Sequence, residues 1–402
     1  MAEQIDIDAV QRYHQQYLDE RGGGTQRGGV SAQMDGLAQK NLSNQRIREL
    51  EIENARLDAA VAREIEFRER LRPYGPGLSM EDAQEYYGNL ISNIGLFVAK
   101  WAIPLINNPD IQARFHAAIA TNPQLIKEFL DYLRTQQDLH RAALEVPHID
   151  QDILAALITR FIHTNVLGSD SLAGIIPRTL VKALDHFQNV MSKCPSDTGL
   201  ADNVPVVSWR AHAQNSVIEH PEYSEQRSLT MTVLTTHLAG ILQFLNIYEE
   251  GEFLADITEQ IIGPAFELQE KFLISTENIF HFEHQQHSPF GQWFNGSREQ
   301  LEDLKCIDSG VFRGRFDVGS LSPEPTIEEL QQLIWLICSI HPALIGQSIY
   351  EGLEDQVIIA MQRVLIHLSR NHRQPTGGTF LAVILKEMDP DGSRGLSVVL
   401  GG

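Results

Sequence analysis

The sequence predicts an all-α protein, with an N-terminal coiled-coil helix, a multi-helix body and a loop-rich segment near residues 287–325. Apolar residues recur at helical spacing through most of the chain, for example at Leu125, Phe129 and Leu133. Proline and capping residues stand where helices would begin. Alternating runs of β-branched residues, which are typical of strands, are nearly absent. Together these three patterns favour helix over sheet.

We expect six segments along the chain, because glycine, proline and charged runs divide the apolar pattern. The first of them buries too little apolar surface to offset the entropy of ordering it. They are a flexible Gly/Gln-rich tail (1–42), a coiled-coil helix (43–72), a helical body (79–290), a loop-rich linker (291–325), a C-terminal helical segment that packs on the body (326–370) and a tail (371–402).

The coiled-coil prediction depends on a seam of residues spaced alternately three and four apart. The seam consists of Ile47, Leu50, Asn54, Leu57 and Val61. An Asn at an a position of such a seam commonly fixes register and oligomeric state. The next two seam positions are charged, so the pattern ends after about two and a half heptads. The alternative is a long solvated helix that packs against the body of its own chain.

The body begins after a Pro/Gly-rich break at residues 73–77. Ser79 followed by Asp82 predicts a capped helix start, and Thr326 followed by Glu329 predicts another near the C-terminus. The apolar run at residues 357–368 fits either a helix or a strand. A second apolar stretch, residues 90–106, contains Lys100 and is too short to span a membrane, so we expect a buried helix.

Composition indicates a soluble protein of an intracellular, reducing compartment, either nucleus or cytoplasm. The three cysteines are far apart and form no CxxC pair, so neither a zinc ribbon nor a redox dithiol is expected. The N-terminus is acidic and polar, unlike a secretory signal or transit peptide. We therefore expect no membrane association and no cofactor.

The net charge of −21 is unevenly distributed along the 402 residues. Residues 1–78 carry 11 basic and 13 acidic side chains, so a net charge of −19 belongs to the rest of the chain. An acidic surface repels phosphate backbones, so nucleic-acid binding by the body is unlikely. Arg21 and Arg27 each precede Gly-Gly, a minimal pattern for contacting nucleic acid; the alternative is a flexible linker.

A zipper that reads DNA needs a dense basic run immediately before it, because that helix must enter the major groove. The stretch before this zipper offers only Arg27, Lys40, Arg46 and Arg48, and the zipper itself balances seven arginines with seven acidic residues. Dimerisation without DNA contact is therefore favoured over a transcriptional regulator.

The densest group of titratable residues is His281, His284 and His287. On a helix, neighbouring members of this group would lie three residues apart and could share a metal ion. The pattern is neither HExxH nor its inverse. The alternative is a solvated helix end, where histidine is favoured by the helix dipole.

Several segments, taken in order, resemble a group of uncharacterised, mostly helical proteins of filamentous fungi that carry a zipper-like N-terminal helix. The resemblance implies a helical fold and an intracellular setting, and no catalytic residues. The segments are 46–57, 152–163, 207–210, 253–257, 265–268, 342–346 and 350–352.

The sequence thus favours a non-enzymatic interaction or regulatory protein that forms a homodimer, or pairs with another zipper protein, through its coiled coil. One alternative is a degenerate zipper-type transcriptional regulator. The other is an enzyme with its site in the helical body, dependent on a metal held by the histidine group.

Overall fold

The computed structural model describes thirteen stretches of the chain, and these divide into two compact units, Met1–Arg72 and Pro73–Gly402. The described stretches are 46–50, 52–57, 78–168, 174–176, 178–191, 203–246, 252–283, 290–310, 315–320, 323, 325–348, 356–368 and 380–388.

In the first unit, residues 46–50 and 52–57 are α-helical, as the sequence predicts. Ile47, Leu50 and Leu57 are 52%, 46% and 57% exposed, and Asn54 is exposed as well. The seam therefore presents apolar side chains to solvent in the single chain. Val61 and the tail with Arg21 and Arg27 lie outside the described residues.

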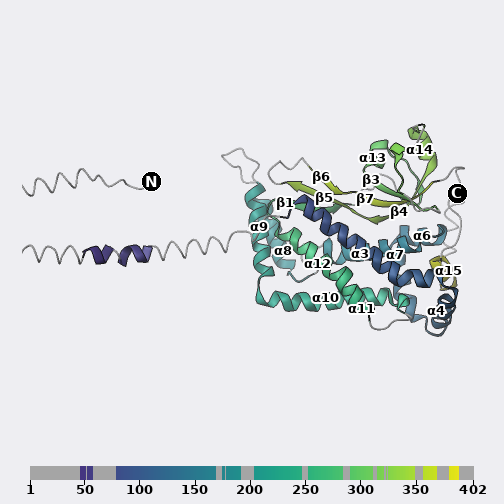
Figure 1. The fold of residues 1–402 in the computed structure, drawn as a ribbon, viewed down its shortest axis with the longest axis horizontal. Helices are drawn as coiled ribbons and strands as arrows, with labels where there is room; N and C mark the ends of the chain where they lie inside the picture. Colours follow the sequence, from purple (N-terminus) through teal and green to yellow (C-terminus); the bar gives the residue numbers. More distant parts are fainter. Residues whose placement is uncertain are drawn as a thin grey trace, which may run out of the picture. The chain divides into compact units, whose positions relative to one another are not determined.

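The second unit is a mixed α/β structure, so the all-α prediction is wrong (Figure 1). Its described helices include two π-helical segments, η1 and η3. The helices are α3 (Met80–Asn107), α4 (Pro109–Thr121), α5 (Gln124–Thr135), α6 (Gln137–Glu145), α7 (Asp150–Ile162), η1 (His163–Leu167), α8 (Arg178–Met191), α9 (Asn203–Ile218), α10 (Pro221–Ile241), η2 (Gln243–Leu245), α11 (Phe253–Asp256), η3 (Ile257–Ile262), α12 (Gly263–Ile274), α13 (Arg298–Glu302), η4 (Val318–Ser320), α14 (Ile327–Leu333) and α15 (Phe380–Met388).

Seven strands of the described residues form two sheets, ordered β1-β5-β6 and β2-β4-β7-β3. All neighbouring strands are antiparallel except β3 and β7, which run parallel. The strands are β1 (Asn278–Glu283), β2 (Gln292–Trp293), β3 (Leu304–Asp308), β4 (Ile334–His341), β5 (Ala343–Ser348), β6 (Gln356–Ala360) and β7 (Gln362–Leu368).

The two sheets share two continuous stretches of chain. Pro342 alone separates β4 from β5, and Met361 alone separates β6 from β7. Proline cannot donate a ladder hydrogen bond, so it interrupts pairing at this point. The result is a bent antiparallel ribbon of two long stretches of chain. Its β5–β6 half belongs to one sheet and its β4–β7 half to the other.

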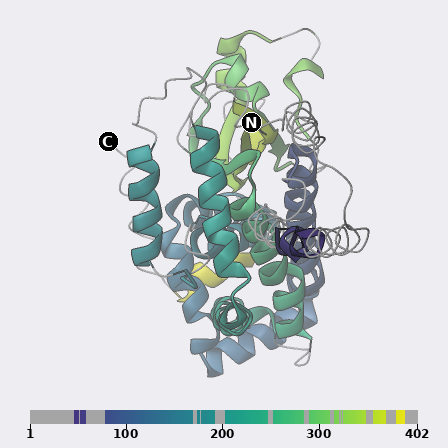
Figure 2. The same cartoon turned by 90° about the vertical axis from the view of Figure 1, so that its left-hand side faces the viewer.

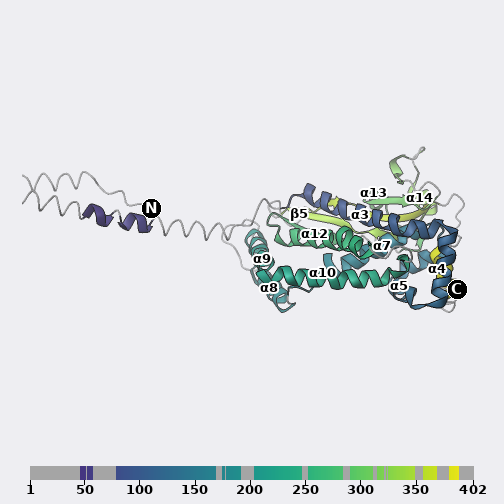
Figure 3. The same ribbon diagram turned by 60° about the horizontal axis from the view of Figure 1, so that its bottom comes forward.

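Helices α3 and α7 pack against this ribbon and against each other, and α12 lies beside α3. Helix α10 contacts η3 and α5, and it lies across the helical layer from the strands (Figures 1 and 3). Figure 2 shows the same order of layers from the side of α9. The main core fills the space between strands and helices, with Phe97, Trp101 and Phe253 in mutual contact inside it.

Helix α3 is the one described helix long and apolar enough to cross a membrane by length and composition. Core helices of soluble proteins pass the same test, so this is weak evidence for a span. Nine of its side chains, among them Phe97 and Trp101, are buried in the core. This helix occupies the stretch that the sequence predicts to be a buried helix.

Four of the predicted segments differ from the prediction, and the first is the helical body (79–290), which contains strand β1 near its end. The supposed C-terminal helical segment (326–370) is helical only in α14 and otherwise contains β4 to β7, while the predicted linker contains β2, α13 and β3. The predicted C-terminal tail contains α15. Every residue of β4 is buried. A strand covered on both faces has a continuous apolar run, which periodicity does not distinguish from a buried helix.

Candidate functional site

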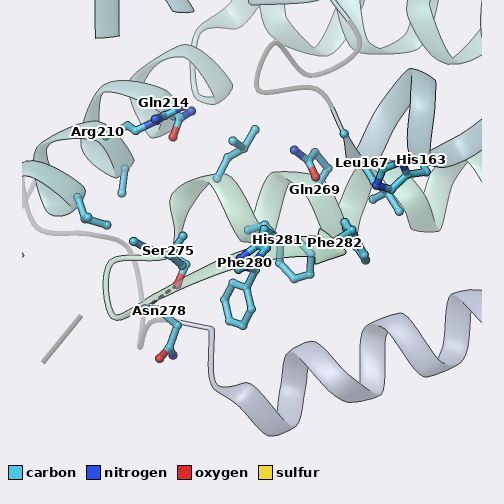
Figure 4. Close-up of a pocket in the computed structure, with 16 residues that line it drawn as sticks. His163, Leu167, Arg210, Gln214, Gln269, Ser275, Asn278, Phe280, His281 and Phe282 are labelled. Atoms are coloured by element: carbon cyan, nitrogen blue, oxygen red, sulfur yellow. Dashed lines mark hydrogen bonds between the residues drawn. The ribbon is translucent and has the colours of Figure 1, made fainter. Parts of the chain in front are cut away.

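A half-enclosed groove of about 460 Å³ lies between α9, α12, η1 and β1 (Figure 4). Its volume is within the range of small-molecule sites, roughly 300–1,000 Å³. Apolar side chains make most of its wall. Its polar wall residues include His163, Arg210, Gln214, Gln269, Ser275 and His281.

Strand β1 forms one side of the groove because its sequence alternates. Phe280 and Phe282, two residues apart, both pack against Phe272 of α12, with ring centroids 4.7 Å and 5.8 Å away. The side-chain amide of Asn278 donates to the carbonyl of Leu78 at 2.8 Å, which holds the start of β1 beside the start of α3. The strand is thereby fixed, and its phenylalanines supply a rigid aromatic wall.

Helix α9 places two polar side chains one turn apart on the opposite wall, and Figure 4 shows Arg210 beside Gln214. The Nη1 of Arg210 lies 3.3 Å from a carboxylate oxygen of Asp185 on α8. That carboxylate is 43% exposed, so solvent weakens the pair. Arg210 therefore brings a positive charge to the groove.

Gln214 is the most unusual side chain of the groove. It is only 2% exposed, yet no hydrogen bond of its side chain is found within the part of the chain that the structure describes. Buried polar groups normally have protein partners, whereas the two amide atoms of Gln214 keep a small contact with solvent instead. An amide that faces a cavity in this state is suited to a ligand or to ordered water.

His163 opens the π-helical segment η1, and π-helical turns are frequent at functional sites. Burial lowers the pKa of His163 below its usual value of 6.5. Its ring meets Phe282 edge-on, with centroids 5.6 Å apart. At neutral pH this imidazole is therefore uncharged, with one nitrogen as donor and the other as acceptor.

The groove differs in charge from the chain as a whole. No aspartate or glutamate belongs to its described wall, where the ionisable residues are Arg210, His163 and His281. The whole chain, by contrast, has a net charge of −21. The described wall thus contains none of the negative side chains that set the net charge of the chain, although Asp185 of α8 lies beside Arg210.

Binding suits these groups better than covalent chemistry. Among the described wall residues, no hydroxyl is hydrogen-bonded to an imidazole or carboxylate, as nucleophilic catalysis would need. The Oγ of Ser275 instead accepts from the backbone N–H of Asn278 at 3.4 Å. The groove combines an apolar wall with a few convergent polar groups, as ligand sites do.

The structure places His281 in strand β1 rather than on a helix. The three-residue helical spacing proposed for the metal group therefore does not apply to it. His284 and His287 lie outside the described residues. Within the described residues, no group of three or more metal-ligating side chains is found.

Sequence reasoning missed the residues that distinguish this groove. Arg210 and His163 enter the sequence analysis only as members of the segments 207–210 and 152–163 of the resemblance, and Gln214 belongs to no motif. Of the predicted histidine group, His281 lines the groove, and His284 and His287 lie outside the described residues. A π-helical turn has no sequence signature, and the groove joins segments more than 100 residues apart.

No family model, no curated protein and no solved structure matches this chain. The resemblance to helical fungal proteins with a zipper therefore stays a prediction. The function has to be argued from the groove and from the seam.

Proposed function

We propose that this chain is a non-enzymatic binding protein of regulatory type, whose α/β body holds a small organic ligand in the groove between β1 and α9. The buried amide of Gln214 carries this proposal. It faces the cavity and makes no hydrogen bond within the described residues. A ligand that hydrogen-bonds to this amide would take the place of the solvent that reaches it.

Shape and rigidity support the same proposal. The wall formed by Phe272, Phe280 and Phe282 is fixed by mutual ring contacts, so it loses little entropy when a ligand binds. The polar groups converge from α9, α12 and η1 on the same space (Figure 4). Such a preformed site can orient a ligand without rearranging the protein.

Screening a fragment library by ligand-observed NMR tests this proposal. In Val207→Trp, a buried wall residue of α9, one turn before Arg210, becomes an indole that fills the groove, and we expect the wild-type hits to disappear. Val357→Trp is the matched control, because Val357 is 51% exposed on β6 and is not part of the described groove wall. Hits that persist in Val207→Trp, or no hits at all, would contradict the proposal.

We further propose that the first unit drives self-association through the seam. The observation in favour is the exposure of Ile47, Leu50 and Leu57, three apolar side chains on one helical stripe. A parallel partner helix would cover them, and Asn54 would set the register. This activity is independent of the groove, and either can fail without the other.

Sedimentation equilibrium of the full chain tests the seam. Leu50→Pro with Leu57→Pro breaks the helix, and Leu50→Gln with Leu57→Gln keeps the helix but removes the apolar stripe; both pairs should sediment as monomers. Ile52→Gln is the control, because Ile52 is 70% exposed but lies off the seam. The dimer proposal fails if the double variants keep the mass of the wild type.

A further inference from the structure

The absence of carboxylates from the described wall of the groove has a consequence for what can bind there. The chain holds 53 aspartates and glutamates, yet the ionisable wall residues are an arginine and two histidines. The described wall thus offers a guanidinium and no carboxylate, and this favours an anionic ligand over a cationic one.

We propose that the ligand is a small organic carboxylate, with its head group at Arg210 and Gln214 and its apolar part against Phe280 and Phe282. This inference rests on the proposed binding function and names its ligand class. The arginine and the amide lie one turn apart on α9, and the phenylalanines lie on β1 (Figure 4). The head and the body of such a molecule would thus meet two chemically different walls.

Arg210 decides the sign of the head group. A guanidinium stays charged at any physiological pH and matches the geometry of a carboxylate. The Nε2 of Gln214 is a donor to such an oxygen, whereas an ammonium head would meet the positive charge of Arg210. A neutral head would gain hydrogen bonds without charge assistance, which are roughly half as strong.

Asp185 competes with a ligand for Arg210. The ion pair between them, at 3.3 Å, is partly exposed and contributes about 1 kcal/mol at most. A ligand carboxylate inside the groove would be less exposed to solvent, and the same charge interaction is stronger there. The Asp185 pair therefore holds the guanidinium in place without preventing a ligand from binding.

Isothermal titration calorimetry with decanoate, decanamide and decylamine, below the concentrations at which they form micelles, tests this inference. The three share one apolar body and differ in the charge of the head. We expect decanoate to bind at least tenfold more tightly than decanamide, and decylamine to bind most weakly. Arg210→Met should weaken decanoate at least tenfold and leave decanamide within twofold.

Two further variants show whether a change in affinity comes from Arg210 itself or from a general effect of substitution on the fold. Asp185→Asn removes the competitor and leaves Arg210 intact, so decanoate should bind as tightly as to wild type or more tightly. Arg134→Met, on the exposed surface of α5, should leave all three affinities unchanged.

The outcomes separate the two proposals. Equal affinity for decanoate and decanamide, both lost in Val207→Trp, overturns the carboxylate and keeps the binding site. If none of the three ligands binds, but other fragments bind and Val207→Trp abolishes their binding, the carboxylate is likewise overturned and the binding site is kept. Failure of the ligands and of the fragment screen together overturns both proposals.

Discussion

Two regions of the body use the same kinds of polar side chain for different ends. The groove at β1 contains an arginine, histidines and glutamines, and so does a buried network between α6, α7, β4 and β7. In the network, Arg160 binds Asp138 through two hydrogen bonds of 2.7 Å and 2.5 Å. His341 lies 2.8 Å from the hydroxyl of Thr159. The hydrogen-bonded residues of this network are 22 to 182 residues apart in the sequence.

The difference lies in where the partners are. In the network, the Nε2 of Gln362 donates to the hydroxyl of Ser339 at 2.9 Å, and the glutamine is fully buried. In the groove, Gln214 is 2% exposed and has no such bond within the described residues. A buried polar group with an internal partner supports the fold, whereas one that faces a cavity without a partner indicates a binding site.

Removing the arginine of the network should produce the largest change in stability. The Arg160 and Asp138 side chains are only 16% and 22% exposed. Burial lowers the pKa of Arg160, but the hydrogen bonds and charge of Asp138 outweigh this effect and raise it. Arg160→Met leaves the carboxylate without its cation, and we expect a loss of about 3 kcal/mol in the free energy of unfolding, measured by urea denaturation.

The matched control is Arg134→Met, which breaks an exposed pair with Asp131 on α5. It should cost at most about 1 kcal/mol. If the two substitutions cost the same, the network does not hold α6 and α7 against β4, and the contrast with the groove loses its basis.

Part of this fold was accessible from the sequence. The capping patterns predicted two helix starts, and the structure contains both. The hydroxyl of Ser79 accepts from the backbone N–H of Asp82, and the hydroxyl of Thr326 accepts from the backbone N–H of Glu329. The strands were missed for a physical reason. Residues 334–341 form an unbroken buried run, and burial on both faces removes the alternation by which a strand is recognised.

The candidate site was much less accessible. A sequence shows that His281 is close to other histidines along the chain, but not that a strand replaces the expected helix there. Nor does it show that Gln214 and Phe282, on different elements, share one cavity. Convergence of this kind depends on tertiary packing, which local propensity does not encode.

Lowering the pH should reduce the free energy of unfolding through His341, a buried residue of the network. Burial, together with the charges of Arg363 and Lys305, lowers the pKa of His341 from 6.5 to about 3. Below pH 6.5 the unfolded chain therefore binds a proton that the folded chain does not. The free energy of unfolding should fall by about 1.4 kcal/mol per pH unit on this account, from pH 6.5 toward pH 3.

Urea denaturation between pH 7 and pH 5 measures this loss. His341→Gln removes the titrating group, so its stability should fall by about 2 kcal/mol less than that of the wild type over this range. Gln362→Met is the control, because it alters the same network without removing a titrating group and should keep the slope of the wild type. A wild-type slope in His341→Gln would show that another group carries the acid sensitivity.

The smallest expected effect separates the two buried glutamines directly. Gln362→Met removes the bond to Ser339 and should cost about 1–2 kcal/mol in the free energy of unfolding. It also removes the Oε1 of Gln362, which has no partner within the described residues, and this gain keeps the cost moderate. Gln214→Met breaks no hydrogen bond within those residues, so stability should change by less than about 0.5 kcal/mol.

For ligand binding, Gln214→Met should have the larger effect and Gln362→Met the smaller one. Fragments that bind in the groove should be weakened by Gln214→Met and unaffected by Gln362→Met, as measured by NMR titration of the same hits. Because methionine is close to glutamine in volume, neither substitution opens a cavity, and the comparison isolates the amide. If Gln214→Met destabilises the protein as much as Gln362→Met does, the amide of Gln214 belongs to the structural framework, and the groove loses the feature that marks it as a site.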